Sequence, residues 1–429
     1  MSSQKIAVIG AGPMGLMCAY ELLKAGHQVD LYERDKQIGG MTASFNFDGL
    51  KIERYYHFIC ATDAPLFALL DELGLSDKCL WKNTKMGFFY NGKLYPWGNP
   101  LALLRFPHLS WLSKFRYALH VMYTKNIRDW GKYDKLYSTP WLKSWIGEKA
   151  YQVLWHSLFE LKFFEYKDAL SAAWIGTRIK RIALSRESLR KERLGYLTGG
   201  SDTLLDALEN QINVLKGNIL LNTQIEKVII SAGKVRGLLV AGEERSYDKV
   251  ISTIPLPYVS RLAPDLPSDT REKIDAIKNI GVACAIFKLK QPLSENFWMN
   301  INDASMKIPG AIEYSNLNPE LATHIVYVPF YMPQTHPKYH QDSQLFIDEV
   351  LGYFKQINPA FQTDWVLANH VSRYEFAQVV CPPNFYEQLP AMKSDVAGFF
   401  MADTSYYYPE DRSISESVKI GKKLAELAR

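Results

Sequence analysis

The sequence predicts an α/β protein whose two domains are interleaved along the chain. Its 429 residues are more than one hydrophobic core usually serves. The first forty residues follow the order strand, glycine-rich turn, helix, strand. Further strand patterns recur from residue 219 to residue 403, after a long helical stretch, and no linker, repeat or low-complexity tract separates the parts. A second domain must therefore be inserted into the first.

The predicted elements follow from hydrophobic spacing. Residues 5–9 and 28–32 are short apolar runs typical of buried parallel strands, and residues 16–25 form a helix that ends at Gly26. Residues 100–194 are mostly helical in pattern. Helices are also expected at 203–214, 344–357 and 413–428, and strands at 219–221, 225–230, 235–240, 250–252, 283–289, 325–328 and 398–403.

Composition excludes several classes of protein. The chain is 47% hydrophobic and 22% charged, which excludes disorder, collagen-like sequence and a coiled-coil rod. No apolar run reaches the roughly 18 residues that a membrane span requires. The five cysteines are odd in number and scattered, so we expect no disulfide framework, no metal site and a cytoplasmic location.

Residues 10–15 read Gly-Ala-Gly-Pro-Met-Gly between the first strand and helix. Gly10 permits a tight turn, Gly12 lets the backbone approach a pyrophosphate, and Gly15 allows the helix to pack closely on the strand. Glu33 ends the second strand, where its carboxylate is placed to accept hydrogen bonds from a ribose. The pattern predicts a Rossmann-type dinucleotide-binding domain whose loop also includes Ala11, Pro13 and Met14.

A second glycine motif, Gly39-Gly40, follows Glu33 and continues into Met41 and Thr42. In this order the chain resembles the flavin amine oxidase and protoporphyrinogen oxidase superfamily, which also includes phytoene desaturases and UDP-galactopyranose mutases. The resemblance recurs at residues 195–200, 222–228, 252–255 and 400–421. It implies an FAD-binding domain made of residues 1–75, 195–265 and 390–429. An α+β substrate-binding domain would take residues 76–194 and 266–389, with a basic, aromatic helical segment at 101–193.

The resemblance also implies non-covalent FAD and assigns residues to it. Arg34 and the residues from Gly39 to Thr42 would continue the pyrophosphate site, and Ile225 would meet adenine through its backbone. Asp403 would face the ribityl or pyrophosphate region. The N–H groups near Ser413 and Ile414, which open the last helix, would meet the N1–O2 edge of the flavin. That helix start would stabilise negative charge on the reduced flavin.

The chain departs from the family pattern at several positions. Many relatives carry arginine where this chain has Met41, and Tyr55 stands where relatives often have a glycine close to the flavin. Amine-oxidising members often place a lysine on the strand that matches residues 282–289, where this chain has Cys284. This absence argues against an oxygen-using amine oxidase. The segment Tyr406-Tyr407-Tyr408-Pro409 replaces a shorter loop.

His57 is the main catalytic candidate, together with Tyr56, because their segment is expected to pass over the flavin ring and histidine suits proton transfer near neutral pH. The alternative for His57 is a hydrogen-bonded structural histidine. Tyr55, Tyr374 and Tyr407 are expected to line the substrate pocket. Arg373 and Tyr386 are no better than structural on local sequence, and Lys162 and Glu165 are expected to be ordinary helix residues.

Three functions remain open at this stage. The first is an FAD-dependent oxidoreductase that moves a hydride from a substrate carbon to flavin N5, with a small-molecule substrate for which hydrophobic or lipid- or glycan-linked compounds are candidates. The second is a non-redox mutase or isomerase of the nucleotide-sugar type, for which Arg54, Arg105, Arg373 and Arg412 could grip a diphosphate. The third is a non-catalytic, FAD-stabilised protein at a membrane.

The segment from Leu101 to Arg193 has eighteen basic and eight acidic residues, a net charge of +10, and six of the ten tryptophans. Such a segment can be a nucleic-acid face, a membrane-surface face or the solvated side of helices. We expect no nucleic-acid partner. Peripheral contact with an anionic membrane on its inner face remains open, because lysine and arginine favour anionic lipid and tryptophan favours the headgroup boundary.

Overall fold

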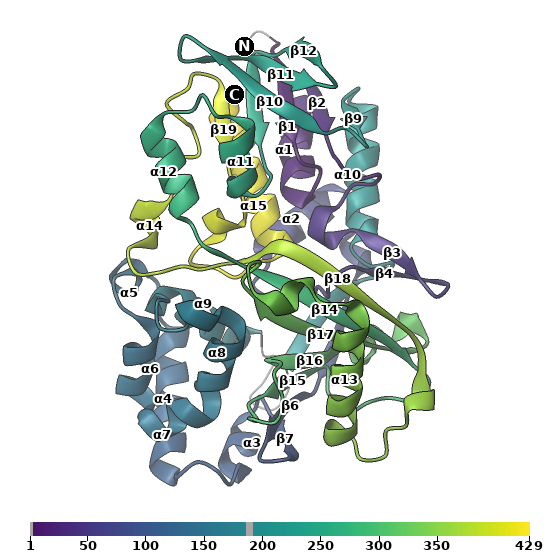
Figure 1. Ribbon diagram of the computed structural model, residues 1–429, viewed down its shortest axis with the longest axis vertical. Coiled ribbons are helices and arrows are strands. Elements are labelled where there is room, and N and C mark those ends of the chain that lie inside the picture. Colours follow the sequence, from purple (N-terminus) through teal and green to yellow (C-terminus); the bar gives the residue numbers. More distant parts are fainter. Residues whose placement is uncertain (1–2, 186–191) are drawn as a thin grey trace.

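The computed structural model of the chain describes residues 3–185 and 192–429, and Figure 1 shows two sheet-based halves with a helical group beside the lower one. The upper half holds a five-stranded parallel sheet next to both chain termini. The lower half holds a seven-stranded, mostly antiparallel sheet. The α/β class and the initial order strand, turn, helix, strand are confirmed.

The parallel sheet is assembled from distant parts of the chain. Its strand order is β19 (Phe399–Met401), β13 (Lys249–Ser252), β1 (Lys5–Ile9), β2 (Gln28–Tyr32) and β9 (Asn218–Leu220). Ile6, Ala7 and Val8 of the central strand are fully buried, as expected for a parallel sheet covered on both faces. Its helices are α1 (Pro13–Lys24), α2 (Ala64–Glu72), α10 (Asp202–Val214) and α15 (Ile414–Ala428).

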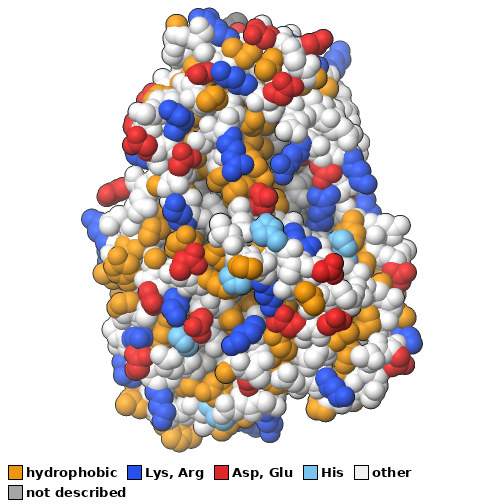
Figure 2. Space-filling view, in the orientation of Figure 1, with side chains coloured by type: hydrophobic (Ala, Val, Ile, Leu, Met, Phe, Trp, Pro, Cys, Tyr) orange, Lys and Arg blue, Asp and Glu red, His pale blue; other side chains and the backbone are white. Residues whose placement is uncertain are grey.

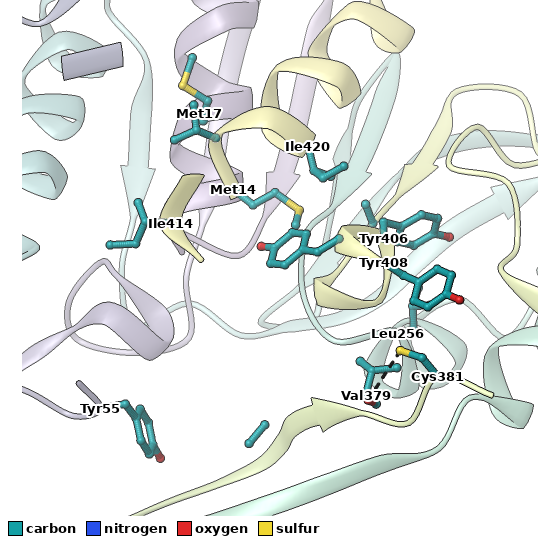
Figure 3. Close-up of a cluster of buried hydrophobic side chains, with 14 of the residues drawn as sticks. Met14, Met17, Tyr55, Leu256, Val379, Cys381, Tyr406, Tyr408, Ile414 and Ile420 are labelled. Carbon is teal, nitrogen blue, oxygen red and sulfur yellow. Dashed lines mark hydrogen bonds between the residues drawn. The ribbon is translucent and has the colours of Figure 1, made fainter. Parts of the chain in front are cut away.

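Close helix packing in this half depends on Gly421. A Cβ atom at this position of α15 would lie 2.5 Å from the carbonyl oxygen of Met14 in α1. Figure 3 shows the buried side chains of Met14 and Met17 together with Ile420 of α15 in this region. The C-terminal helix is thereby held against the helix that follows the first glycine motif.

The seven-stranded sheet has the order β18 (Val366–Val379), β14 (Asn279–Leu289), β17 (His324–Met332), β16 (Gly310–Glu313), β15 (Trp298–Ile301), β6 (Met86–Tyr90) and β7 (Lys93–Trp97). All neighbouring pairs are antiparallel except β15 and β6. Helix α13 (Ser343–Ile357) buries Phe346, Val350 and Phe354 against the sheet in a second hydrophobic core.

Residues 100–184 form the helical group at the lower left of Figure 1. Its helices are α3 (Pro100–Arg105), α4 (Trp111–Lys125), α5 (Gly131–Asp134), α6 (Ser138–Ile146), α7 (Glu148–Tyr151), α8 (Ser157–Phe163) and α9 (Ala172–Leu184), and a π-helical turn, Gln152–His156, precedes α8. The helical pattern predicted for this stretch is confirmed. Residues 186–191 of the basic segment lie outside the described residues.

The remaining strands and helices lie outside the two large sheets and the helical group. They are β3 (Ser44–Phe47), β4 (Leu50–Glu53), β5 (Cys79–Thr84), β8 (Glu192–Leu197), β10 (Ile225–Ser231), β11 (Lys234–Val240), β12 (Glu243–Ser246), α11 (Leu256–Leu262), α12 (Ser268–Ala276) and α14 (Phe385–Gln388). Strands β10, β11 and β12 form a three-stranded sheet in the upper half (Figure 1). Strand β5 pairs with β8, and β3 pairs with β4. The domain boundaries given above stay a prediction.

Candidate functional site

A cavity of about 850 Å³ lies between the two halves. Its walls include the carboxyl ends of β1, β2 and β13, the start of α15, and residues of β14, β17 and α8. The face of the molecule in Figure 2 is hollowed where the two halves meet. Ligands in open parallel sheets bind at the carboxyl ends of the strands, so this cavity is the candidate site.

The first glycine motif forms one end of the cavity. Gly10 has φ = +99°, and a Cβ there would lie 2.9 Å from Ile254 Cγ2. A Cβ on Gly15 would lie 1.8 Å from the Gly10 carbonyl oxygen, so this glycine is required for packing. The space around Gly12 is open within 4 Å among the residues that the structure describes. Gly12 therefore presents bare backbone to the cavity.

The second glycine motif folds back onto the first. The Gly39 N–H donates to the Ala11 carbonyl oxygen at 2.8 Å, and Gly39 and Gly40 have φ of +112° and +55°. A Cβ on Gly40 would lie 3.5 Å from the Gly12 Cα. Gly40, Met41 and Thr42 then line the cavity beside Pro13 and Met14. Ala11, Gly15 and Gly39 are absent from its lining and support the loop from behind.

Glu33 links the glycine loop to the end of β2. Its Oε2 accepts a hydrogen bond from the Ala11 N–H at 2.8 Å, and its Oε1 accepts one from the Asp35 N–H at 2.9 Å. These bonds orient the carboxylate at the cavity wall, and each oxygen keeps a further lone pair for a hydroxyl. Arg34 also lines the cavity, with its guanidinium 4.9 Å from the centre of the Tyr258 ring.

The later predicted cofactor residues meet at the same cavity. Ile225, Asp403, Ser413 and Ile414 all line it. The Asp403 carboxylate accepts hydrogen bonds from the Leu256 N–H at 2.8 Å and the Ser405 N–H at 2.9 Å, and its burial raises its pKa. Ser413 caps α15 by accepting from the Glu416 N–H at 3.1 Å. The positive end of this fifteen-residue helix therefore faces the cavity.

These features fit a dinucleotide. Backbone without side chains at Gly12, the uncapped start of α1 and the oriented Glu33 carboxylate suit a pyrophosphate followed by a ribose. The start of α15 offers N–H groups at a second place, as the edge of a flavin ring requires. The predicted cofactor residues, far apart in sequence, thus converge on one cavity.

The predicted substrate-lining tyrosines also reach the cavity. Tyr55, Tyr374 and Tyr407 line it, and the rings of Tyr55 and Tyr374 are 6.5 Å apart. Burial raises the pKa of all three phenols, so they stay neutral at physiological pH. Cys284 of β14 lines the cavity as well, and burial raises the pKa of its thiol.

The neighbours of Tyr407 have structural contacts instead. The Tyr406 hydroxyl donates to the Pro390 carbonyl oxygen at 2.9 Å, and the Tyr408 hydroxyl donates to Asp134 at 2.5 Å. Both residues belong to the buried cluster of Figure 3, which also holds Cys381. Tyr386 is 46% exposed and packs edge-to-face against Tyr408, and it does not line the cavity.

His57 lies on the cavity wall with a partner that we did not predict. Its Nδ1 is 2.5 Å from Glu53 Oε2, and the other carboxylate oxygen of Glu53 accepts from the Ser201 N–H at 2.8 Å. Glu53 is only 7% exposed. The two residues are four apart outside a helix, a spacing that has no periodic meaning, so local sequence gave no signal for the pair.

Tyr56 lies deeper among aromatic side chains. Its ring is 5.4 Å from that of Trp298 and 5.9 Å from that of Tyr327. Its hydroxyl is hydrogen-bonded to Tyr331, and burial raises its pKa well above the usual range. Tyr56 is therefore a neutral hydrogen-bonding group next to His57.

Lys162, expected to be an ordinary helix residue, also lines the cavity. Arg181, Asp63, Asp411 and Arg412 line the cavity as well. These residues come from α8, α9, the start of α2 and the segment before α15. A lysine in an amphipathic helix is usually solvated, so sequence alone could not reveal this position.

The described residues contain no group of histidine, cysteine and carboxylate side chains suited to a metal ion. Within the same residues no helix is long and apolar enough to cross a membrane.

The chain is similar to known flavoproteins along most of its length. The family model of flavin containing amine oxidoreductases matches residues 15–409. The 15-cis-phytoene desaturase of Synechococcus elongatus is 25% identical over 287 residues, which are 61% of this chain and 60% of that enzyme. The alignment therefore spans less than two thirds of that relative.

Two solved structures share the fold. A putative protoporphyrinogen oxidase from Exiguobacterium sp. 255-15 has a TM-score of 0.77 at 18% identity and covers 100% of this chain and 99% of its own. Reduced UDP-galactopyranose mutase has a TM-score of 0.77 at 16% identity, with coverage of 99% and 95%. With the family model spanning most of the sequence, the chain belongs to the flavin containing amine oxidoreductase family.

Proposed function

We propose that the protein oxidises a small, largely apolar molecule by hydride transfer from carbon, with His57 as the proton acceptor. The observation that carries this proposal is the Glu53–His57 pair, which faces the same cavity as the two glycine motifs. Bound FAD, held by the glycine loop, Glu33 and the start of α15, supplies the hydride acceptor.

Glu53 determines which nitrogen of His57 is available. With Nδ1–H donating to the carboxylate, Nε2 is left as the basic nitrogen. Ser201 fixes the carboxylate from its other side, so the imidazole is held in one orientation. A proton released from a substrate N–H or O–H group would be accepted at Nε2 as the carbon is oxidised.

The walls of the cavity favour an apolar substrate. Tyr55, Trp298, Tyr314, Tyr374 and Phe376 line it, and these rings exclude water around a reacting carbon. One similar protein is named a 15-cis-phytoene desaturase, and a desaturase removes hydrogen from carbon, as this proposal requires.

Anaerobic mixing of the holoenzyme with candidate substrates tests this function. A substrate should bleach the flavin absorbance, and His57→Ala should slow bleaching at unchanged FAD content by about a hundredfold. If flavin reduction is as fast in His57→Ala as in the parent protein, His57 has only a structural role. Bleaching by none of a broad set of alcohols, amines and polyenes would contradict the oxidoreductase mechanism proposed here.

The arginine contacts disfavour the mutase alternative. Arg54 pairs with Asp35 at 2.7 Å, and all three nitrogens of Arg373 donate to Tyr339, Ser343 and Gln341. Arg105 is exposed and lies outside the cavity lining. Among the residues that the structure describes, Arg412 is the one of these four arginines that keeps a buried nitrogen without a hydrogen-bond partner, and one such nitrogen is too little to bind a diphosphate.

We also propose that α3 and α4 rest on an anionic membrane and bring a lipid-like substrate to the cavity. The polarity of α4 is inverted: its buried residues are Lys114, His120 and Thr124. Its exposed stripe is apolar and continues onto α3; it consists of Trp111, Leu112, Phe115, Leu119 and Met122 with Leu101 and Leu104. Trp111 is 72% exposed and Met122 is 64% exposed. Hydrophobic side chains gather along the lower left rim in Figure 2, over this helical group.

Charge favours lipid over another apolar partner. Exposed Arg105 and Lys125 stand at the ends of α3 and α4, with Arg128 and Lys132 nearby in sequence. Apolar side chains with basic neighbours match the boundary of an anionic bilayer, where each basic residue contributes about 1 kcal/mol.

Co-sedimentation with vesicles tests this surface. Vesicles that contain phosphatidylglycerol should retain the protein, vesicles of phosphatidylcholine should not, and binding should fall as salt rises. Phe115→Ser with Met122→Ser should weaken binding about tenfold. Leu345→Ser, at an exposed leucine of α13, is the matched control and should change nothing. Protein that stays in the supernatant, or a dimer in solution that buries this stripe, would refute membrane docking.

A further inference from the structure

Lys162, Arg181 and Arg412 line the cavity, and Arg178 lies behind them on α9; two of these four cations have carboxylate partners. Arg178 pairs with Asp411 at 2.8 Å, and Arg181 pairs with Asp63 at 3.1 Å. Lys162 and Arg412 have no carboxylate within 4 Å in the part of the chain that the structure describes. Two cationic side chains therefore stand at the cavity without a direct ion-pair partner, and the carboxylate that acts on both of them, Asp411, is paired with Arg178.

Lys162 is surrounded by ring faces. Its Nζ lies 5.1 Å from the ring centre of Tyr331, 5.5 Å from that of Trp174 and 5.9 Å from that of Phe163. Among residues 3–185 and 192–429 it has no hydrogen-bond partner. Aromatic faces compensate only part of the loss of water around a buried ammonium, so an anion would be strongly favoured there.

Arg412 also has unused hydrogen-bonding capacity. Its guanidinium donates to the Ala377 carbonyl oxygen and is hydrogen-bonded to Tyr331, but its Nε–H is buried with no partner in the described residues. Tyr331 thus contacts both cations, and all three residues line the cavity. The Arg412 Nε–H and the Lys162 ammonium could both donate hydrogen bonds to an acceptor group of a ligand in the cavity, which would remove the cost of leaving a buried donor without a partner.

We infer that Lys162, Arg412 and Tyr331 form a subsite for an anionic group of the substrate, a carboxylate or a phosphate. This inference rests on the proposed function for the identity of the cavity as the substrate site. The substrate would then be amphipathic: the apolar body lies among the aromatic rings, and the acidic group is held by the two cations. Arg178 and Arg181 are ion-paired with Asp411 and Asp63 and serve as support. The Arg178 Nε–H also lacks a hydrogen-bond partner in the described residues, but Arg178 does not line the cavity.

The subsite should depend on pH because Lys162 titrates near neutrality. Burial, with Arg412 and Arg178 as neighbours, lowers the pKa of Lys162 to about 7, and Asp411 opposes that shift. The Tyr56 and Tyr331 hydroxyls on the facing elements are hydrogen-bonded to each other, and burial keeps the Tyr56 phenol neutral. Below about pH 7 Lys162 is cationic, and above it the free site loses its charge, so anion affinity falls by up to tenfold per pH unit.

Calorimetric titration of the FAD-loaded protein with three probes tests the subsite. Benzoate carries a carboxylate, phenyl phosphate carries a phosphate, and benzamide is a neutral mimic of benzoate. At about pH 6.5 the preferred anion should bind at least about tenfold more tightly than benzamide. The better of the two anions identifies the acidic group. Equal affinity for benzoate, phenyl phosphate and benzamide would overturn the inference.

Variants at Lys162 separate charge from packing. Lys162→Met should weaken anion binding about tenfold or more at unchanged FAD content. Lys162→Arg keeps a cation at every accessible pH, so it should bind the anion without the loss between about pH 7 and 9. Lys167→Met, at an exposed lysine that pairs with Glu160, is the matched control. A flat pH profile in the parent protein, or equal losses in Lys167→Met, would overturn the subsite.

The titration involves no turnover, so its outcome is independent of the oxidoreductase test. Anion binding without flavin bleaching would contradict the proposed function alone. Bleaching by substrates with no preference for acidic ones, together with equal probe affinities, would contradict the anion subsite alone.

Discussion

One part of the cavity wall consists mainly of backbone atoms, and another part consists of side chains. The glycine-loop end consists mainly of backbone from residues 10–15 and 39–42, held together by local hydrogen bonds and Glu33. The opposite end, around Lys162, consists of side chains brought together from α8, α9, β17 and the segment before α15. A site made of backbone depends on residues that have no side chain, whereas a site made of side chains depends on pairing between distant elements.

The largest expected effect is at the glycine-loop end. Gly12→Leu should abolish FAD binding because its side chain would occupy the open space at the loop while meeting no protein atom within 4 Å of its Cβ. The fold should survive, as measured by circular dichroism and thermal unfolding. Gly352→Leu, at a glycine of α13 that also has open surroundings, should keep full FAD content. If Gly12→Leu binds FAD as well as the parent protein does, the pyrophosphate of FAD does not lie against Gly12.

Between the two ends, Glu53→Gln should slow flavin reduction by about a hundredfold, because His57 loses the carboxylate that orients it. The pH profile of the reaction should shift, since glutamine carries no charge. His57→Ala combined with Glu53→Gln should be no slower than His57→Ala alone. Additive losses in anaerobic stopped-flow measurements would show that Glu53 does not act through His57.

At the opposite end, Asp63→Asn should destabilise the protein by about 3–5 kcal/mol because it leaves the buried Arg181 without its carboxylate partner. Urea unfolding at neutral pH measures this change. Asp77→Asn is the control, since Asp77 and its partner Lys78 are exposed and such a pair contributes little. Equal stability of Asp63→Asn and the parent would mean that Arg181 is not held by this pair.

The smallest expected effect concerns the inverted helix α4. Burial lowers the pKa of His120 to about 4, whereas an unfolded histidine titrates near 6.5. The unfolded state therefore binds the proton first, and stability should fall by about 2–3 kcal/mol between about pH 6.5 and pH 4. His120→Phe, which keeps a ring against Trp141 and Trp145, should remove this part of the pH dependence. An unchanged pH dependence of the melting temperature in His120→Phe would contradict it; His156→Gln, at a more exposed histidine, is the control.

The sequence predicted the glycine-loop end well because its signals are local. Residues 5–32 have the predicted strands and helix, and Gly10, Gly15 and Gly39 occupy the positions that their backbone or packing requires. Ser413 caps the last helix where that helix was expected to begin. Each of these features is specified by neighbours within a few residues.

The partners of the predicted residues could not be found in this way. The carboxylate of Glu53 is held between His57 and Ser201, and Ser201 is 148 residues further along the chain. Arg181 lies 118 residues from Asp63, and Lys162 meets Tyr331 across an even longer separation. No spacing rule connects such residues, so Lys162 was expected to be an ordinary helix residue.

By itself, the sequence determined the α/β class, the order of strands and helices, the glycine-rich loop and a set of site residues most of which line the cavity. These depend on hydrophobic period, glycine geometry and helix caps, which act over a few residues. The tertiary structure alone decided that Glu53 contacts His57, that Lys162 and Arg412 line the cavity without a direct ion-pair partner in the described residues, and that α4 turns its apolar side outward. The physical reason is that burial and charge pairing depend on which distant elements pack together, and a single sequence contains no local signal for that packing.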